Sequence, residues 1–576
     1  MPIHNADVAT VFEEVADLLD LQGANPFRIR AYRNAARTLS QLSEPVAEMI
    51  RDGRDLSELP DIGDDLAEKI EVIVQTGTLP LLEELEKEVD PAMTELMDVP
   101  GLGPSRVRTL HDELGISSRA ELTKAAEEGK VRTIKGFGEK SEQNILKGLK
   151  DIGEEKRWLL SRADPVVHSL KAYLEDHEAV EKVDVAGSYR RRKETVGDLD
   201  LLVLSDDGVA VSNHFVEYED VVDVASKGDT RSTVRLRSDI QVDLRVVPPD
   251  SYGAALLYFT GSKAHNVALR NRAVNKGMKI NEYGVFRVNG EEERIGGETE
   301  EGIYGLFDLP YIVPELRENR GELEAAQGGH LPNLITLDDL RGNLHAHTTD
   351  SDGQDSIQAM AEAAKERGLE YLAITDHSPA VAVAQGLDSD ELRRQMDAID
   401  ELNEMMVGVR VLKSIEVDIM KDGSLDLPDD VLDELDLCVC SVHTSLGLSE
   451  KEQTERILRA MDNPNFHILA HPTGRRLNQR GPIDVDLDRI MEAAVERGCF
   501  LELNAQPQRL DLNDVYCKRA KELGLKISIG ADAHARDELD FLKYGIDQAR
   551  RGWLEPGDVL NTMSWNEIKP LIDARR

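Results

Sequence analysis

The pattern of apolar positions divides the chain into a helical first part and later parts that also contain strands. In the first 150 residues apolar side chains recur every three or four positions, as at Val8, Val11, Phe12, Val15 and Leu18. This spacing predicts amphipathic helices. Residues 151–317 mix such segments with short alternating runs that are typical of strands. From about residue 335, apolar runs and helical segments take turns, which predicts parallel strands in an open sheet or a closed barrel.

Three segments of the helical part share an apolar residue, a tight turn with glycine and the start of a new helix. They are LPDIGDDLAEKI (59–70), VPGLGPSRVRTL (99–110) and IKGFGEKSEQNIL (134–146). Glycine permits the sharp turn, and the backbone N–H groups at the next helix start can hold a phosphate. The pattern indicates helix-hairpin-helix units that bind the DNA backbone at Gly63, Gly101, Gly103, Gly136 and Gly138. Plain helical hairpins are the alternative, and the first copy has Asp61 where the pattern prefers glycine.

Length and charge limit the classes of protein that fit. The 576 residues suffice for several domains, and 69 basic against 110 acidic side chains give a net charge of −41. DNA-binding proteins usually carry basic surfaces, so either this chain avoids nucleic acid or it works in a salt-rich, halophilic cytoplasm. At ~1 M salt the Debye length falls to about 3 Å, which screens long-range repulsion. The hairpin motifs favour the second explanation.

The remaining composition predicts a cytoplasmic monomer without membrane contact. No apolar run reaches the roughly 18 residues that a membrane span needs. The cysteines Cys438, Cys440, Cys499 and Cys517 form no C-x-x-C pair, so neither a disulfide framework nor a thiolate zinc site is indicated. Cys438 and Cys440 lie in an apolar strand and are expected in the core.

The stretch GDLDLLVL (197–204) places two carboxylates on one face of a strand, since residues i and i+2 share a face. Asp243, in DIQVDLRVV (239–247), lies opposite the apolar face of a second strand. Carboxylates from adjacent strands suit Mg²⁺ or Mn²⁺, and two such ions can clamp an in-line phosphoryl displacement. An exposed acidic strand face is the alternative. The Gly187-Ser188 turn with arginines, AGSYRRRKETVGDLD (186–200), favours a metal and triphosphate site.

These residues carry a resemblance to a known family. Gly187-Ser188, followed by Gly197, Asp198 and Asp200, resembles the nucleotidyltransferase signature of family X DNA polymerases. Asp243 falls at that family's third carboxylate. The segments YFTGSKAHNVALR (258–270) and GMKINEYGVF (277–286) resemble the nucleotide-selecting and thumb segments of polymerase beta-like enzymes. With the hairpins and NPFRIRAYRNAA (25–36), the resemblance covers about residues 1–317.

The resemblance implies roles for individual residues. Asp198 and Asp200 would bind both metals, and Asp243 would bind one and help to deprotonate the primer 3′-hydroxyl. The nucleotide-binding set would be Gly187, Ser188, Arg191, Tyr258, Phe259, Gly261 and Asn266, with Ser188 and Arg191 on the triphosphate. Tyr258 and Phe259 would lie near the sugar, unless they are ordinary core residues. Asn266 and Arg270 would reach the minor groove of the DNA.

Three positions depart from the family pattern. Gln241 stands where polymerase beta-like enzymes have an arginine, two residues before the third carboxylate. Lys69 matches the family's 5′-deoxyribose phosphate lyase lysine, but Asp65 and Asn34 replace neighbouring lysines. A solvated helix lysine is therefore an equal alternative to a lyase nucleophile at Lys69.

The last part of the chain concentrates histidine and carboxylate at the ends of expected strands. Six of the 14 histidines lie there, where α/β and barrel folds build their sites. The candidate ligands are His345, His347, Asp352, His377, Glu416, His443, His471, Asp532 and His534. Imidazole with carboxylate suits Mn²⁺, Zn²⁺ or Fe²⁺, and nine ligands suffice for two or three ions. Such a cluster would activate water and neutralise a phosphate ester.

This part resembles the PHP (polymerase and histidinol phosphatase) family, and the ligand positions of that pattern are filled. The resemblance implies a distorted (β/α)₇ barrel with a trinuclear metal site. In bacterial and archaeal family X polymerases the domain is fused C-terminally, as here. For a domain fused in this way, the resemblance implies a Mn²⁺-dependent 3′–5′ exonuclease with related 3′-end processing and abasic-site cleavage.

Together these observations predict a multidomain α and α/β protein. The expected domains are an 8-kDa-like helical domain (1–90), fingers-like hairpins (91–155), a nucleotidyltransferase palm (156–250), a thumb (251–317), a linker (318–334) and a PHP barrel (335–576). We expect a base excision repair polymerase that adds deoxynucleoside triphosphates to primer–template DNA at short gaps and processes 3′ ends. The alternatives are a PHP phosphoesterase of small metabolites with a non-catalytic DNA-binding half, and a non-catalytic DNA-end scaffold.

Overall fold

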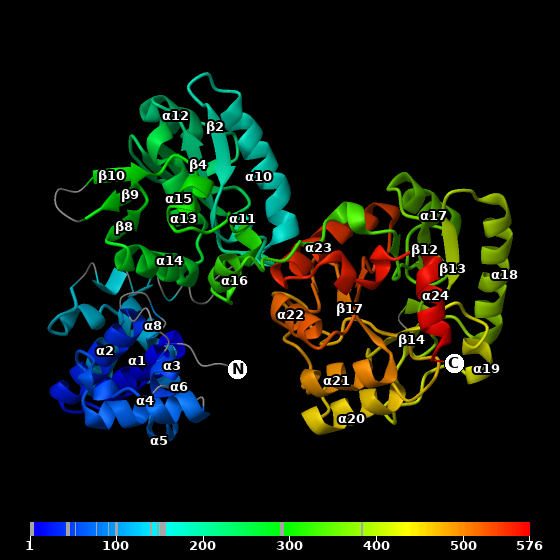
Figure 1. The fold of residues 1–576 in the computed structure, drawn as a ribbon, viewed down its shortest axis with the longest axis horizontal. Helices are drawn as coiled ribbons and strands as arrows, with labels where there is room; N and C mark the ends of the chain where they lie inside the picture. The colour runs from blue at the N-terminus through cyan, green and yellow to red at the C-terminus, as the bar shows by residue number, and fades with distance from the viewer. Residues whose placement is uncertain are drawn as a thin grey trace. The chain divides into compact units, whose positions relative to one another are not determined.

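The computed structural model describes residues 5–41, 46–51, 53–76, 78–89, 91–97, 99, 102–138, 141–143, 145–146, 149, 157–288, 293–381 and 384–575. The chain divides into two compact units. One comprises Met1–Lys156 with Arg270–Gly277, and the other Arg157–Leu269 with Met278–Arg576. Figure 1 shows the elements of each unit in chain order.

The first unit is helical where it is described, as the apolar spacing predicts. Phe12 and Tyr32 meet edge to face at 5.3 Å between ring centres and join helices α1 and α2 in its core. Its main helices are α1 (Asn5–Leu21), α2 (Pro26–Gln41), α3 (Val46–Arg51), α4 (Asp64–Thr76), α5 (Pro80–Glu88), α6 (Pro91–Leu96), α7 (Pro104–Leu114) and α8 (Arg119–Glu127).

The second unit begins with a sheet whose strand order is β2-β4-β7-β6-β5. Its strands are β2 (Lys182–Val185), β4 (Asp198–Leu204), β5 (Val221–Lys227), β6 (Arg231–Leu236) and β7 (Gln241–Val247). Strands β4 and β7 run parallel, and the other neighbours are antiparallel. The apolar residues Leu199, Leu201 and Leu244 are buried in one cluster with helix α10 (Leu160–Glu175). Because side chains alternate along a strand, Asp198, Asp200 and Asp243 lie on the other face.

A smaller sheet and four helices follow. Helices α13 (Tyr252–Thr260) and α14 (Lys263–Asn275) precede the sheet β10-β9-β8, made of β8 (Met278–Asn281), β9 (Gly284–Arg287) and β10 (Glu293–Gly296), with α15 (Glu300–Leu306) after it. The segment expected to be a linker contains helix α16 (Glu322–Gly328). Glu322 is fully buried and hydrogen-bonds His265 Nδ1 at 2.6 Å. This helix therefore packs against the first part of α14, up to Leu269, which belongs to the same unit.

The C-terminal part is a barrel of parallel strands with helices outside it, coloured yellow-green to red in Figure 1. The strands are β11 (Gly342–Asn343), β12 (Tyr371–Ile374), β13 (Arg410–Lys413), β14 (Glu416–Asp418), β15 (Val439–Ser441), β16 (Ile468–Leu469), β17 (Phe500–Asn504) and β18 (Ile527–Gly530). They form the sheets β11-β12-β13 and β14-β15-β16-β17-β18. Parallel bridges His377–Glu416 and Ala346–Ala533 join the two sheets at both sides.

With β13 and β14 sharing one interrupted position, the ring has seven strand positions, so the distorted (β/α)₇ barrel is confirmed. The surrounding helices are α17 (Ile357–Glu366), α18 (Ser389–Met405), α19 (Asp429–Leu432), α20 (Glu450–Ala460), α21 (Leu487–Arg497), α22 (Asp514–Glu522), α23 (Leu542–Arg551) and α24 (Trp565–Asp573). The four cysteines are buried, and none of them forms a disulfide in the described part of the chain. In the part of the chain that is described, no helix combines the length and hydrophobicity needed to cross a bilayer.

The barrel and the first sheet of the second unit are packed directly against each other. Leu510 and Tyr544 of the barrel belong to the apolar cluster beneath β4 and β7. The Tyr544 hydroxyl donates to Asp164 of α10 at 2.9 Å. Arg475 forms a two-pronged ion pair with Glu194, at 3.1 Å for each N–O contact.

Candidate active sites

The first site lies where β4 and β7 pair side by side. Asp200 stands directly opposite Asp243 in the parallel register, and Asp198 precedes Asp200 on the same face. Burial and the negative charges of Asp198 and Asp243 raise the pKa of Asp200 to about 7. A divalent cation would remove this repulsion, so the donor set fits a hard-oxygen metal site. The structure thus brings together the three carboxylates that the sequence singled out.

The Gly187-Ser188 turn is held against these carboxylates. The backbone N–H of Ala186 donates to the Asp200 carbonyl at 2.7 Å. Gly187 has a φ of 63°, and a Cβ at this position would collide with the Asp200 carboxylate. Only glycine therefore lets the short helix α11 (Gly187–Arg190) start so close to the metal-binding face.

Asp243 is oriented by residues of two strands. Thr233 Oγ1 donates to one of its oxygens, and Gln241 Nε2 donates to the other at 2.9 Å. A guanidinium nitrogen of Arg231, on β6, lies 3.8 Å from Asp243 Oδ1. Gln241, which departs from the family pattern, therefore donates a hydrogen bond to the third carboxylate. Positive charge comes instead from Arg231 on the neighbouring strand.

The other expected nucleotide-binding residues gather around the end of α13. Arg191 donates to the Thr260 carbonyl, and its Nε donates to Glu318 at 3.0 Å. A Cβ at Gly261 would lie 3.2 Å from the same guanidinium. Tyr258 is 38% exposed and is not a core residue. Asn266 Nδ2 donates to the Tyr258 carbonyl at 2.7 Å.

Two more expected positions lie on α13 and α14. The Phe259 ring packs under the Arg245 guanidinium, 4.1 Å from its centre. Arg270 lies one turn after Asn266 on α14. The roles of these residues toward a nucleotide and DNA remain predictions.

The hairpin turns of the first unit explain the unusual Asp61. This residue has a φ of 61°, in the left-handed region, and Gly136 has a φ of 96° at the matching position of the third copy. Asp61 therefore adopts the conformation for which the third copy uses glycine, at a cost of about 1 kcal/mol. Gly63 directly precedes α4, and Gly103 caps α7. Gly138 follows Gly136, and Gly101 lies outside the described residues.

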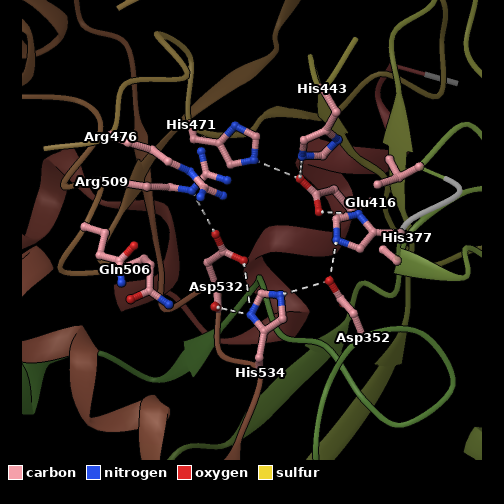
Figure 2. Close-up of a pocket in the computed structure, with 13 residues that line it drawn as sticks. Asp352, His377, Glu416, His443, His471, Arg476, Gln506, Arg509, Asp532 and His534 are labelled. Atoms are coloured by element: carbon pink, nitrogen blue, oxygen red, sulfur yellow. Dashed lines mark hydrogen bonds and ion pairs between the residues drawn. The ribbon is translucent and has the colours of Figure 1, made fainter. Parts of the chain in front are cut away.

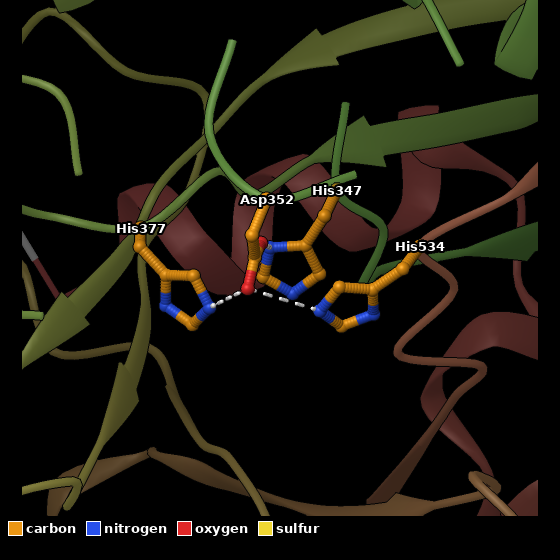
Figure 3. A group of neighbouring side chains, drawn as sticks. All are labelled: His347, Asp352, His377 and His534. Atoms are coloured by element: carbon orange, nitrogen blue, oxygen red, sulfur yellow. Dashed lines mark ion pairs between the residues drawn. The ribbon is translucent and has the colours of Figure 1, made fainter. Parts of the chain in front are cut away.

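The second site lies at the C-terminal ends of the barrel strands (Figure 2). Three overlapping groups of side chains place their ligand atoms within 4.8 Å of one another: His347, Asp352, His377 and His534 (Figure 3); His345, His347 and Asp532; and His377, Glu416 and His443. His347 and His377 each belong to two groups. Such an arrangement suits neighbouring metal ions whose sets of nearby ligands overlap. His471 completes the set, with Nε2 at 2.9 Å from Glu416.

The electrostatics of this cluster fit bound cations. Burial opposes ionisation of Glu416, but the imidazoles of His443, His377 and His345 hold its pKa well below the usual range. The buried ring nitrogens His345 Nε2, His347 Nδ1 and Nε2, and His377 Nδ1 have no hydrogen-bond partner in the described part of the chain. Buried polar atoms are rarely left without a hydrogen-bond partner in folded proteins. Imidazole nitrogen with carboxylate oxygen suits Mn²⁺, Zn²⁺ or Fe²⁺.

A second layer of carboxylates, which sequence reasoning missed, orients these ligands. Glu502 accepts from His345 Nδ1 at 2.7 Å and from the His471 backbone N–H at 2.8 Å. Asp418 accepts from the His443 backbone N–H at 2.9 Å. Asp376 accepts from the Thr348 backbone N–H at 2.8 Å. Each lies on or just after a strand, so an acidic residue at a strand end was the available signal.

The fold and both sites define a class: a nucleotidyltransferase palm joined to a metal-dependent phosphoesterase barrel. Family models match along the chain: a helix-hairpin-helix domain (3–79), a SAM-like helix-hairpin-helix tandem (93–151), a DNA polymerase beta thumb (255–318) and a PHP domain (343–506).

A protein of Bacillus subtilis (strain 168) named DNA polymerase/3′-5′ exonuclease PolX is 37% identical over 574 residues, covering 99% of both chains. The chain belongs to this PHP-containing group of family X DNA polymerases, which confirms the resemblance seen in the sequence. Probable phosphatases from Thermoanaerobacter sp. (strain X514) and Caldanaerobacter subterraneus are 31% and 30% identical over 232 and 250 residues. Those alignments cover 38% and 41% of this chain and 89% and 93% of the relatives.

Proposed function

We propose that this chain is a DNA polymerase that extends primer 3′ ends at short gaps and removes 3′-terminal nucleotides at its PHP site. The proposal is carried by the three carboxylates side by side on β4 and β7 and the three histidine and carboxylate groups of the barrel, in a chain that matches the PolX relative over 99% of its length. A non-catalytic scaffold would have no use for either cluster.

At the palm, Asp198, Asp200 and Asp243 would hold Mg²⁺ or Mn²⁺. When bound, these ions stabilise the attacking and leaving oxygens of phosphoryl transfer. Asp243, aligned by Thr233 and Gln241, accepts the proton of the primer 3′-hydroxyl. The Gly187-Ser188 turn and Arg191 bind the triphosphate of the incoming deoxynucleotide.

The rest of the nucleotide site would surround the sugar and the new base pair. Tyr258 and Phe259, with Gly261 after them, border the sugar and disfavour a ribose. Asn266 and Arg270 bind the minor groove.

At the barrel, the nine ligands would hold two or three Mn²⁺, Zn²⁺ or Fe²⁺ ions. Bound there, such ions would activate water and offset the charge of the phosphodiester. The protein's own part is to fix the His345 imidazole through Glu502, the His443 backbone through Asp418 and the Thr348 backbone through Asp376. The open side of the pocket would admit a strand end. Cleavage beside an abasic site would use the same groups.

The hairpin turns would bind the DNA backbone, and molar salt would screen the −41 charge that opposes it. We infer that the protein acts in base excision repair as a monomer in the cytoplasm. The lyase activity is not part of the proposal. Lys69 is ion-paired with Asp65, so its amine is engaged by a carboxylate.

The test is an assay on gapped DNA that carries a labelled primer, with Mn²⁺ and rising KCl. We expect nucleotide addition with deoxynucleoside triphosphates present, 3′-end shortening without them, and both activities to persist into molar salt. Hydrolysis of p-nitrophenyl phosphate without any reaction on DNA would instead establish the small-metabolite phosphatase suggested by the two phosphatase relatives. Activity confined to low salt would reject the halophilic explanation.

A further inference from the structure

A second cavity adjoins the metal pocket of the barrel and is lined by arginines. The metal pocket has a volume of about 280 Å³, and the adjoining cavity about 370 Å³. The two share His443, Arg476 and Arg509, so they form one continuous depression. Arg480 lines only the second cavity. Figure 2 shows Arg476 and Arg509 side by side on the wall opposite Asp352.

The guanidinium groups of Arg476, Arg480 and Arg509 line the second cavity together, without a carboxylate in its lining to offset their charge. The charge of Arg509, with burial and Arg480, lowers the pKa of Arg476. Within the described residues, neither Arg476 nor Arg480 forms an ion pair with a carboxylate, and Arg509 lies 3.5 Å from Asp532. The cavity has no acidic residue in its lining. In a chain with 110 acidic side chains, guanidinium groups gathered in a cavity without a carboxylate suit an anionic ligand.

The loop that carries these arginines is held in place from behind. Arg475 points away from the cavity to the Glu194 carboxylate, and its Nε donates to the Arg509 carbonyl at 3.0 Å. The Arg476 backbone N–H donates to the Arg480 carbonyl at 2.8 Å, which closes a tight turn. Because the loop is ordered in advance, little entropy is lost when an anion binds.

The rest of the lining distinguishes a nucleotide from a bare phosphate. Val442 and Leu446 form an apolar wall, and Gln479 adds an amide. An apolar wall beside guanidinium groups suits a sugar or base that is joined to a phosphodiester.

We propose that this cavity binds the penultimate nucleotide of a DNA strand whose last phosphodiester lies on the metal cluster, with Arg476 and Arg480 on its 5′ phosphate. The proposal rests on the exonuclease function above and deepens it. The 3′-terminal nucleoside carries no further phosphate, so the cationic side must hold the 5′ side of the strand. The cavity thereby selects polynucleotide ends over small phosphate esters.

The test compares Arg480→Gln with wild type on two substrates, a 3′-hydroxyl oligonucleotide and the p-nitrophenyl ester of thymidine 5′-monophosphate. The second has a scissile diester but no neighbouring phosphate. We expect KM for the oligonucleotide to rise about tenfold with kcat unchanged, as loss of one charge-assisted contact predicts. The nitrophenyl ester should show no change. The slope of log KM against log[KCl] for the oligonucleotide should fall by about 0.7.

Two further variants make the result specific. Arg480→Lys keeps the charge and should restore most of the oligonucleotide KM. Arg394→Gln removes a charge from the exposed face of α18, where its nearest acidic contact is Glu391 at 3.9 Å, and should change nothing. Equal effects of Arg480→Gln on both substrates, or none on either, would overturn the proposal.

Failure of the exonuclease function would be seen separately. If wild type hydrolysed p-nitrophenyl phosphate but not DNA, the cavity would be tested by inhibition. The inhibition constant of the trinucleotide of thymidylate would be measured for hydrolysis of p-nitrophenyl phosphate. A higher inhibition constant in Arg480→Gln would support the cavity, and an unchanged constant would overturn it.

Discussion

The two candidate sites solve the problem of holding divalent metal in opposite ways. The palm uses three carboxylates from two neighbouring strands, and Asp198 is exposed to solvent. The barrel uses six imidazoles and three carboxylates from around a closed ring, and most of them are buried. The difference teaches that donor chemistry follows the task. An all-oxygen site suits Mg²⁺ that arrives with a nucleotide, whereas imidazoles retain softer resident ions.

The largest expected effect is the loss of one activity alone. Asp200→Asn removes the carboxylate that faces both Asp198 and Asp243, so nucleotide addition should fall by at least about 10³-fold. Exonuclease activity should stay within twofold. Primer extension and 3′-end release on the same labelled substrate measure both rates. A parallel loss of both would show that the sites are not independent.

The reverse separation should follow from the barrel. His345→Ala combined with His347→Ala removes ligands from two of the three overlapping groups, and we expect exonuclease activity to fall by about 10³-fold. Nucleotide addition should be unchanged. The melting temperature serves as the control for folding, and a variant that still shortens DNA at the wild-type rate would remove the barrel from the account.

A smaller effect is expected one layer further out. Glu502→Gln keeps the size of the side chain but weakens its hold on His345, so Mn²⁺ affinity and exonuclease rate should drop about 10–100-fold. Titration of Mn²⁺ against activity gives the affinity. The matched control is Glu522→Gln on the surface of α22, which should have no effect. Equal behaviour of the two variants would mean that Glu502 does not position a ligand.

The smallest effect concerns the hydrogen bonds that orient Asp243 in the palm. Gln241→Ala removes one of two hydrogen bonds to Asp243 and leaves that of Thr233. The loss of about 1 kcal/mol predicts a roughly fivefold lower kcat for nucleotide addition, without change in exonuclease rate. Single-turnover incorporation measures this step. A loss as large as that of Asp200→Asn would mean that Gln241 itself takes part in the chemistry.

The structure brings together the candidate metal ligands that the sequence named, whereas the contacts that support them were not predicted. Period-two alternation placed Asp198 and Asp200 on one face, and the structure adds that Asp200 faces Asp243 in register. The contacts of Glu502 with the His345 ring and of Arg475 with Glu194 could not be predicted, because they join residues 157 and 281 positions apart along the chain. Helix α16 was missed because its sequence is polar, which is typical of a linker. Its Glu322 is nevertheless buried, where it hydrogen-bonds His265. Local patterns reveal periodic elements, whereas single long-range pairs have no local pattern.

The most direct test of the two-site account is anomalous X-ray diffraction at the zinc edge, on crystals soaked with trace Zn²⁺ in excess Mg²⁺. The account predicts zinc peaks among His345, His347, His377 and His534, and none between Asp200 and Asp243. Zinc bound equally at both sites, or at neither, would contradict the claim that donor chemistry divides the metals between the two sites.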